Sequence, residues 1–243
     1  MERFKGLNSG AVVGVVQARM NSVRFPQKMI SKLGGIQLLE WVIIRASKSR
    51  NLNKLVLAIG KGVSDDPLEE LAKKYNILIF RGNENDVLSR IAGAAKKYDA
   101  DIVVRICADN PFIDPNQIDI LINSFKSGSY DYMCNHQNRL NSGFADGFGA
   151  EILSASILHQ LTTYDLDQSF REHATSYIWA HFKRYKISVL QAPANLAYPH
   201  LKFDVDFLED LNKLNSLVDA GVTIESRAEE IIKIALNLLD CKE

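Results

Sequence analysis

Short unbroken apolar runs and longer stretches with helical spacing alternate along the first half of the chain. The unbroken runs predict buried strands at 12–17, 55–59, 77–81 and 101–106. Apolar residues spaced three and four apart predict helices at 37–49, 66–74, 86–98 and 116–126. This alternation is typical of a mostly parallel sheet with helices on both faces. The sequence therefore predicts an α/β fold.

The alternation changes after residue 130. A short strand is predicted at 131–135, and residues 136–150 are polar and show little periodicity. The predicted elements that follow are helices at 152–163 and 171–182, a strand at 187–192, an extended segment at 201–205, and helices at 209–220 and 226–239. We therefore predict a single domain over 10–240, with an inserted arm at about 136–200 for acceptor or dimer contacts.

Composition narrows the class of protein. With 47% hydrophobic residues among 243, the chain can bury a full core as one large α/β domain or two small ones. Its 29 basic and 29 acidic residues balance, which argues against a general nucleic-acid binder. Three widely spaced cysteines suit a reducing cytoplasm. Neither a membrane-length apolar run nor a signal-peptide core at 1–10 is present, so a cytoplasmic protein without a membrane partner is expected.

A cationic loop follows the first predicted strand. Arg19, Ser22, Arg24 and Lys28 lie within ten residues of each other, directly after the buried run at 12–17. In open α/β sheets, loops at the carboxyl ends of strands bind anions, and polyphosphate is the obvious candidate. The alternative is a solvated basic loop.

Acidic residues follow two other extended segments. Asp109 comes just after the predicted strand at 101–106, where it could hold a divalent cation or make a turn before Pro111. Asp204 and Asp206 fall on one side of an extended segment. Because Mg²⁺ prefers one or two carboxylates plus phosphate oxygens, Asp109 with Asp206 would suffice if they meet in space.

Two further polar clusters are candidates. The loop 81–86 could read a base edge, or could simply be a loop with Asp86 at a helix N-cap. The run 171–173, together with His136, Asp146 and Glu151, could line a small polar substrate pocket. Phosphate-loop, dinucleotide-fingerprint, zincin and nucleophile-elbow motifs are absent, which argues against kinases of the P-loop type, dehydrogenases and serine hydrolases.

Several motifs together resemble one family. The run Ala18-Arg19-x-x-Ser22-x-Arg24-Phe25-Pro26-x-Lys28 resembles the signature of sugar-acid cytidylyltransferases, the group of the CMP-Kdo and CMP-sialic acid synthetases. The nearest branch is that of the spore-coat polysaccharide biosynthesis cytidylyltransferases. Its other patterns recur in order as Phe80-Arg81-Gly82, Asp86-Val87-Leu88-x-Arg90, Val104-Arg105-Ile106-x-Ala108-Asp109-x-Pro111, Arg171-Glu172-His173 and Val205-Asp206-x-x-Glu209-Asp210-Leu211.

The resemblance implies a three-layer, Rossmann-like fold of the GT-A-like nucleotidyltransferase type and assigns roles to residues. Arg19 and Lys28 would be catalytic, neutralising charge as pyrophosphate leaves, and Asp109 and Asp206 would hold Mg²⁺. The implied nucleotide-binding residues are Gln17, Ala18, Arg19, Ser22, Arg24, Lys28, Arg81, Gly82, Asn83, Asp86, Arg105 and Ala108, with 81–86 as the cytosine reader. The implied acceptor-binding residues are Asp146, Glu151, Glu172, His173 and Lys202.

The implied activity is transfer of CMP from CTP to a sugar acid or related acceptor, with release of pyrophosphate, for polysaccharide or glycan biosynthesis. A homodimer is the implied assembly. Two alternatives stay open: a nucleotidyltransferase for a phosphorylated acceptor, and a nucleotide-binding partner protein without catalysis. The chain departs from the family at Gln27, where glycine is frequent, at Phe207-Leu208, which replaces Thr-Pro, and at 59–61, where a Thr-Asp pair is missing.

Overall fold

One seven-stranded sheet organises residues 10–240, the part of the chain that the computed structural model describes. Its strands, in spatial order, are β5 (Leu78–Gly82), β4 (Lys54–Gly60), β1 (Val12–Gln17), β6 (Ile102–Cys107), β8 (Glu151–Ser154), β7 (Tyr132–Cys134) and β9 (Ile187–Val189). The first four are parallel, β8 runs antiparallel to both of its neighbours, and β9 is parallel to β7. The predicted mostly parallel α/β sheet is confirmed. The expected absence of a signal-peptide core concerns residues 1–10, of which 1–9 lie outside the described part.

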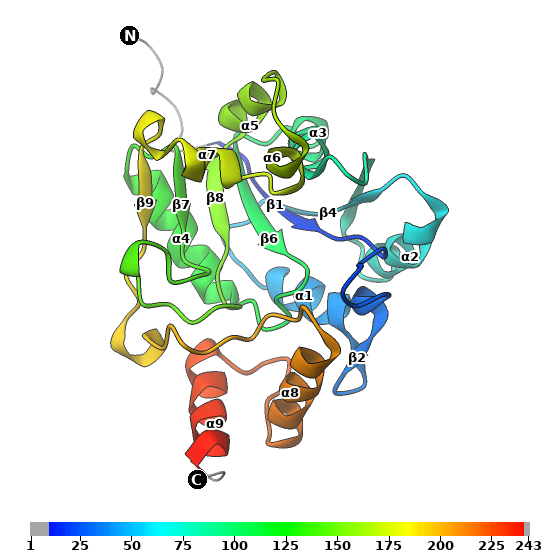
Figure 1. Ribbon diagram of the computed structural model, residues 1–243, viewed down its shortest axis with the longest axis vertical. Coiled ribbons are helices and arrows are strands. Elements are labelled where there is room, and N and C mark those ends of the chain that lie inside the picture. Colours follow the sequence, from blue (N-terminus) through cyan, green and yellow to red (C-terminus); the bar gives the residue numbers. More distant parts are fainter. Residues whose placement is uncertain (1–9, 241–243) are drawn as a thin grey trace.

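Two apolar cores, one on each face of the sheet, make the fold three-layered. Val12 and Val16 of β1 belong to one core, while Val13 and Val15 belong to the other, as the alternation of side chains along a strand requires. The first core is covered by α1 (Leu38–Ala46), α2 (Asp66–Lys74), α4 (Pro115–Ser127), α8 (Leu208–Asp219) and α9 (Ala228–Asp240). The second is covered by α3 (Val87–Lys97), α5 (Ala155–Thr162) and α7 (Ser176–Ala180). Figure 1 shows α8 and α9 at one end of the molecule, away from α3 and α5.

The predicted helix at 152–163 begins too early, because its first residues form strand β8. Ile152 points into one core and Leu153 into the other, which makes the strand buried on both faces. The Ser154 hydroxyl accepts a hydrogen bond from the Ile157 amide and starts α5. A short apolar run fits either element, so periodicity alone could not separate them.

The predicted helix at 171–182 is interrupted. The structure has α6 (Gln168–Glu172), a break at 173–175, and then α7. His173 leaves the helical conformation with φ −104° and ψ 73°. The segment at 201–205 is extended but makes only a bridge between Asp146 and Lys202. The predicted strand at 187–192 is confirmed only over β9.

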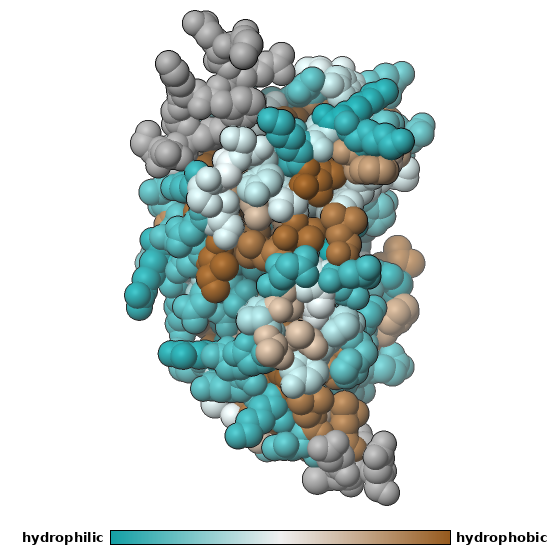
Figure 2. Space-filling view, turned by 90° about the vertical axis from the view of Figure 1, so that its left-hand side faces the viewer, coloured by the Kyte–Doolittle hydropathy of each residue, from teal (hydrophilic) through white to brown (hydrophobic). Residues whose placement is uncertain are grey.

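The segment predicted as an inserted arm, 136–200, contributes β8 and β9 to the main sheet. Figure 2 shows the face beside the edge strand β9, where a band of apolar surface lies among polar side chains. The dimer contacts expected from this segment stay a prediction. Within the described residues, no helix has the length and apolar character needed to cross a membrane.

The parallel strands place two loops side by side. In the sheet register, Gln17 at the end of β1 lies opposite Ala58 of β4 and Cys107 of β6. The cationic loop after β1 and the acidic loop after β6 therefore emerge at the same edge. The Ala18 amide donates to the Ala58 carbonyl over 3.1 Å and fixes the start of the first loop.

A buried arginine supports the acidic loop after β6 through hydrogen bonds to its backbone. Arg45 of α1 is 2% exposed. Its guanidinium donates to the carbonyls of Ile113 (2.8 Å) and Phe112 (3.3 Å), which follow Asp109, and to that of Ile224 (2.8 Å) between α8 and α9. These carbonyls would otherwise be buried without donors.

We therefore expect Arg45→Met to lower the free energy of unfolding by about 3 kcal/mol, because it leaves buried carbonyls unsatisfied. Urea denaturation measures the change. The matched control is Arg50→Met on the surface, expected to change stability by less than about 0.5 kcal/mol. Equal effects of the two substitutions would contradict the role of Arg45.

Candidate functional site

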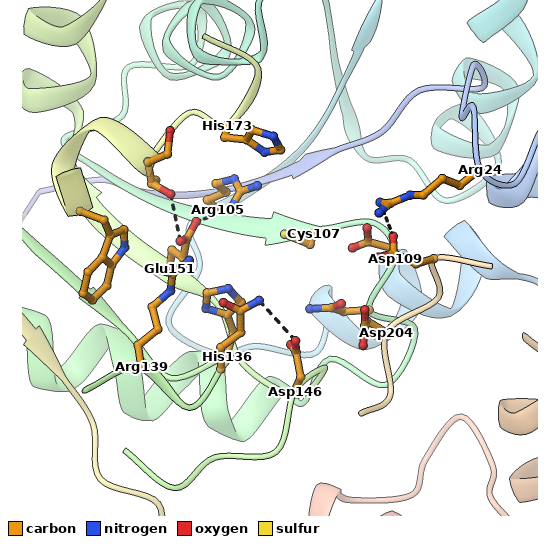
Figure 3. Close-up of a pocket in the computed structure, with 16 residues that line it drawn as sticks. Arg24, Arg105, Cys107, Asp109, His136, Arg139, Asp146, Glu151, His173 and Asp204 are labelled. Carbon is orange, nitrogen blue, oxygen red and sulfur yellow. Dashed lines mark hydrogen bonds and ion pairs between the residues drawn. The ribbon is translucent and has the colours of Figure 1, made fainter. Parts of the chain in front are cut away.

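Two adjoining cavities open where the loops after β1 and β6 meet. The smaller measures about 220 Å³ and the larger about 370 Å³. Of the residues predicted from the sequence, the smaller is lined by Gln17, Ala18, Arg19, Ser22, Arg24, Lys28, Arg105, Ala108, Asp109, Glu172 and His173. The larger is lined by Arg24, Arg105, Asp109, His136, Asp146, Glu151, His173, Asp204 and Asp206 (Figure 3). The shared residues make the two cavities one continuous site.

Lys28 lies at the junction of the site's acidic residues. Its side chain is buried, and its Nζ donates to the Val205 carbonyl (2.6 Å) and to Asp109 Oδ2 (3.4 Å). The same Nζ lies 3.8 Å from Asp206 Oδ1. The structure thus brings together two carboxylates that are about a hundred residues apart in the sequence.

The backbone before Lys28 takes a left-handed turn. Gln27 has a φ of 58°. Glycine adopts that conformation without strain, so a non-glycine residue here stores some backbone strain next to Lys28.

Two ion pairs connect the cationic loop to the opposite walls. Arg24 contacts Asp206 Oδ1 over 2.7 Å, and its guanidinium lies 5.5 Å from the centre of the Phe207 ring. Arg19 contacts Glu172 of α6 over 2.8 Å. Both arginines therefore stand in the site with their charges balanced by carboxylates.

Asp206 precedes the turn into α8, which contains Phe207 and Leu208. The amides of Asp206 (2.9 Å) and Phe207 (2.8 Å) both donate to Asp210 Oδ2, which fixes the turn into α8. The side chain of Asp210 thus supplies the start of the helix.

A buried ion pair forms the floor between the cavities. Glu151 of β8 pairs with Arg105 of β6, and its other oxygen accepts from Tyr132 (2.5 Å) and Thr175 (3.0 Å). Burial raises the pKa of Glu151, but the Arg105 charge and these hydrogen bonds outweigh it and lower that pKa to about 2. Arg105 also donates to the Gln17 side chain over 3.1 Å. Glu151 thus lines the larger cavity with both of its oxygens held by protein partners, and its expected contact with the acceptor stays a prediction.

Asp146 and Asp204, which also line the larger cavity, have raised pKa values, in contrast to Glu151. Burial, with the nearby charge of Asp204, raises the pKa of Asp146 to about 7. Burial also raises the pKa of Asp204 itself. Burial lowers the pKa of His136 to about 4 and raises that of Cys107 to about 12, so both are neutral at pH 7.

The family comparison covers the whole site. The cytidylyltransferase family profile matches residues 13–234. The chain belongs to the cytidylyltransferase family. The spore coat polysaccharide biosynthesis protein SpsF of Bacillus subtilis is 30% identical over 92% of this chain and 93% of its own length. The 3-deoxy-manno-octulosonate cytidylyltransferase of Chloroherpeton thalassium is 35% identical over 46% of this chain and 44% of its own length.

Solved structures agree with the fold. A cytidylyltransferase from Leptospira borgpetersenii superposes with a TM-score of 0.87 at 27% identity, over 95% of this chain and 96% of that one. A CMP:2-keto-3-deoxy-manno-octonic acid synthetase in complex with CTP has a TM-score of 0.66 at 15% identity, over 87% of this chain and 100% of that one. The predicted family and the nucleotidyltransferase-like fold are confirmed.

The loop 81–86, suggested by the sequence as base reader, lines neither cavity. Arg81 turns to α2 and pairs with Asp66 and Glu69, both at 2.5 Å. Asp86 caps α3 through the Ser89 amide (2.9 Å) and pairs with Arg171 (2.8 Å). A role of this loop in reading the base stays a prediction.

Three other predicted residues also stand outside the cavity walls. Asn83 Oδ1 accepts from the amides of Asn85 (2.9 Å) and Asp86 (3.2 Å), so it shapes its own loop. A side chain at Gly82 would meet Arg90 at 2.9 Å. Lys202 is exposed, and its backbone pairs with Asp146.

Sequence reasoning missed several cavity residues. Arg90 lines the smaller cavity, is 2% exposed, and donates from NH1 to the carbonyls of Asn83 and Glu84, both at 2.9 Å. Its place in the family pattern was a signal that it mattered. The missed residues of the larger cavity include Gln137, Thr175, Ser176 and Trp179. The expected helix over 171–182 hid those that follow the break.

The raised pKa of Asp146 predicts a pH dependence of stability. An unfolded aspartate titrates near 3.8, below the folded value of about 7, so the folded state holds its proton longer. Stability should therefore fall as the pH rises between these values, by at most about 1.4 kcal/mol per pH unit from this group. Asp146→Asn should remove that slope in urea titrations. Asp165→Asn, at an exposed position, should keep it, and a slope unchanged in Asp146→Asn would contradict the assignment.

Proposed function

We propose that this cytidylyltransferase transfers CMP from CTP to a sugar acid and releases pyrophosphate. The observation that carries the proposal is Lys28, held by the Val205 carbonyl within 3.4 Å of Asp109 and 3.8 Å of Asp206. A cation beside two carboxylates is suited to a metal-bound triphosphate. The sugar acid and the nucleotide are named in similar proteins: a 3-deoxy-manno-octulosonate cytidylyltransferase and a synthetase complexed with CTP.

The reaction is an in-line displacement at phosphorus. An acceptor hydroxyl gives up its proton to solvent as its oxygen bonds to the α-phosphorus, the bond to the bridging oxygen of the β-phosphate breaks, and that oxygen leaves with pyrophosphate. Negative charge grows on the leaving group, so fixed cations speed the step mainly by electrostatic stabilisation and positioning. Arg19 and Lys28 are the side chains proposed for this role.

The donor set fits a magnesium ion. Among residues 10–240, no group of three or more His, Cys, Asp or Glu side chains forms a ready metal site. Asp109 and Asp206 are two carboxylates on the triphosphate side, and Mg²⁺ takes its remaining ligands from water and phosphate oxygens. These two aspartates would hold Mg²⁺, which supplies charge neutralisation and orients the phosphates.

Substrate groups can replace the carboxylate or arginine partners in two ion pairs of the ligand-free site. A phosphate can replace Glu172 as partner of Arg19, and a cation can replace Arg24 as partner of Asp206. The displaced side chains, Glu172 and Arg24, are 40% and 59% exposed, so water can solvate them when their partners change.

A phosphorylated acceptor is the second candidate. It is favoured by Arg139, which lines the larger cavity and has no carboxylate partner among the described residues. A role in polysaccharide biosynthesis, as in the name of the Bacillus subtilis relative, a cytoplasmic location and a homodimer stay predictions.

Pyrophosphate release tests the function. CTP, UTP, ATP and GTP are each mixed with Mg²⁺ and a panel of sugar acids and sugar phosphates. We expect release with CTP and at least one sugar acid, and its loss when EDTA removes Mg²⁺. Release only with sugar phosphates would select the second candidate. CTP binding without release from any acceptor would indicate a nucleotide-binding protein without catalysis.

Lys28→Ala should lower kcat by about 100- to 1000-fold, the cost typical of losing one preorganised electrostatic contact to the transition state. The variant should retain its circular dichroism spectrum, because Asp109 and Asp206 are about one-third exposed and can be hydrated. Lys32→Ala is the matched control, since Lys32 is exposed. A variant with a near-normal rate would remove Lys28 from the reaction.

A further inference from the structure

A buried aspartate joins the cationic loop to the neighbouring strand. Asp65, directly before α2, is 1% exposed. Its Oδ1 accepts from the Met20 amide over 2.8 Å, and its Oδ2 accepts from the Gly60 amide over 2.7 Å. Met20 lies in the loop after β1, which passes beside α2 in Figure 1, and Gly60 is the last residue of β4. One carboxylate therefore links the carboxyl ends of two adjacent strands.

The place of Asp65 in the sequence would ordinarily favour a different contact. Asp65 is the N-cap residue of α2, where an aspartate side chain usually accepts from amides of its own helix. It makes no such hydrogen bond, and α2 has Pro67 in its first turn instead. A buried carboxylate is stable only when its oxygens accept hydrogen bonds, and here both amides come from outside the helix. The side chain thus serves the two strand ends.

The two strands separate at this point, and the carboxylate spans the space between them. The Ala18 amide still donates to the Ala58 carbonyl of β4 over 3.1 Å. Two residues later, the Met20 amide donates to Asp65 in place of a strand carbonyl. The fit is close, because a Cβ on Gly60 would stand 2.7 Å from Asp65 Oδ2. A residue without a side chain is therefore needed at the end of β4.

The Met20 peptide transmits this restraint to the rest of the loop. Its carbonyl accepts from the Gln27 amide over 3.4 Å, which closes the loop on itself. Arg19 directly precedes Met20, and Lys28 directly follows Gln27. Both cations proposed to act on the triphosphate are therefore attached to the segment that Asp65 holds.

We propose that Asp65 is a positioning residue, whose carboxylate fixes the cationic loop so that Arg19 and Lys28 face the triphosphate. The assignment rests on the proposed function for the reaction, but its effect on nucleotide binding can be measured without turnover. Fixed cations stabilise a transition state better than mobile ones, so a released loop loses rate although both charges remain. Asp65 itself lines neither cavity and touches no reacting group.

Asp65→Asn tests the restraint, because an amide side chain can accept from one backbone N–H but places its own NH2 against the other. CTP binding is measured by calorimetry with Mg²⁺ and without an acceptor, and turnover by pyrophosphate release. We expect CTP binding about tenfold weaker, the scale of one lost hydrogen bond. We expect kcat about 10- to 100-fold lower, the scale of an ångström-sized misplacement of a catalytic group.

Two further variants control the result. Asp119→Asn is the matched control, because Asp119 also accepts from backbone amides, those of Arg50 (3.1 Å) and Asn51 (3.0 Å), but before β4, at the opposite edge of the sheet. It should leave CTP binding and kcat unchanged. Gly60→Ala keeps the carboxylate but crowds its Oδ2, so it should weaken both in the same direction as Asp65→Asn. Gly60→Ala carries the test if Asp65→Asn does not fold.

A double-mutant cycle distinguishes positioning from a loss of stability. All rates are measured well below the unfolding temperature of each variant. If Asp65 acts through Lys28, Asp65→Asn should lower kcat much less in a Lys28→Ala background than in the wild type. Equal fold-losses in the two backgrounds overturn the proposal, as do wild-type CTP binding and kcat in both Asp65→Asn and Gly60→Ala.

The outcomes also separate this proposal from the function on which it rests. Pyrophosphate release that is equal in wild type, Asp65→Asn and Gly60→Ala supports the reaction and removes Asp65 from it. Absence of release from wild type with every acceptor, together with CTP binding that weakens in Asp65→Asn but not in Asp119→Asn, refutes the reaction and supports the restraint. A wild type that neither binds CTP nor releases pyrophosphate refutes both.

Discussion

The buried carboxylate of Glu151 is the contact on which the site depends. It joins β8 to β6 through Arg105, to β7 through Tyr132, and to the break before α7 through Thr175. Arg105 extends the network to Gln17 at the end of β1. One charge pair thus fixes the floor between the nucleotide-side cavity and the acceptor-side cavity. A buried carboxylate is stable only with such partners, so the same network that shapes the site also makes Glu151 tolerable.

This dependence explains which parts of the molecule could be predicted from the sequence. The strands β1, β4, β5 and β6 lie in largely apolar runs separated by amphipathic helices, and a local pattern is enough to define them. Strand β8 is short and is buried on both faces because it lies between β6 and β7. That position depends on pairing with distant segments, which a local sequence pattern does not show. The break before α7 has the same origin, because Thr175 is held by Glu151 across the sheet.

The cationic and the acidic residues of the site differ in how far the sequence alone could group them. The cationic loop follows one strand directly, so Arg19, Arg24 and Lys28 could be grouped from their spacing alone. The meeting of Asp109 with Asp206 required the family pattern, since they belong to distant segments joined by the Asp109 carbonyl and the Val205 amide at 2.9 Å. For the loop 81–86 the spacing showed the charges but not their partners, because Asp66, Glu69 and Arg171 reach them from α2 and α6.

The larger cavity combines two opposite electrostatic environments. Its floor holds Asp146 and Asp204, whose raised pKa values mean that adding a second negative charge there is costly. Its opposite wall offers the Arg139 guanidinium, which has no carboxylate partner among the described residues. A bound molecule with hydroxyls at the aspartates and negative charge at Arg139 avoids that cost, whereas a second anionic group would face the aspartates. The two walls thus respond to where a molecule carries its charge as well as to how much it carries.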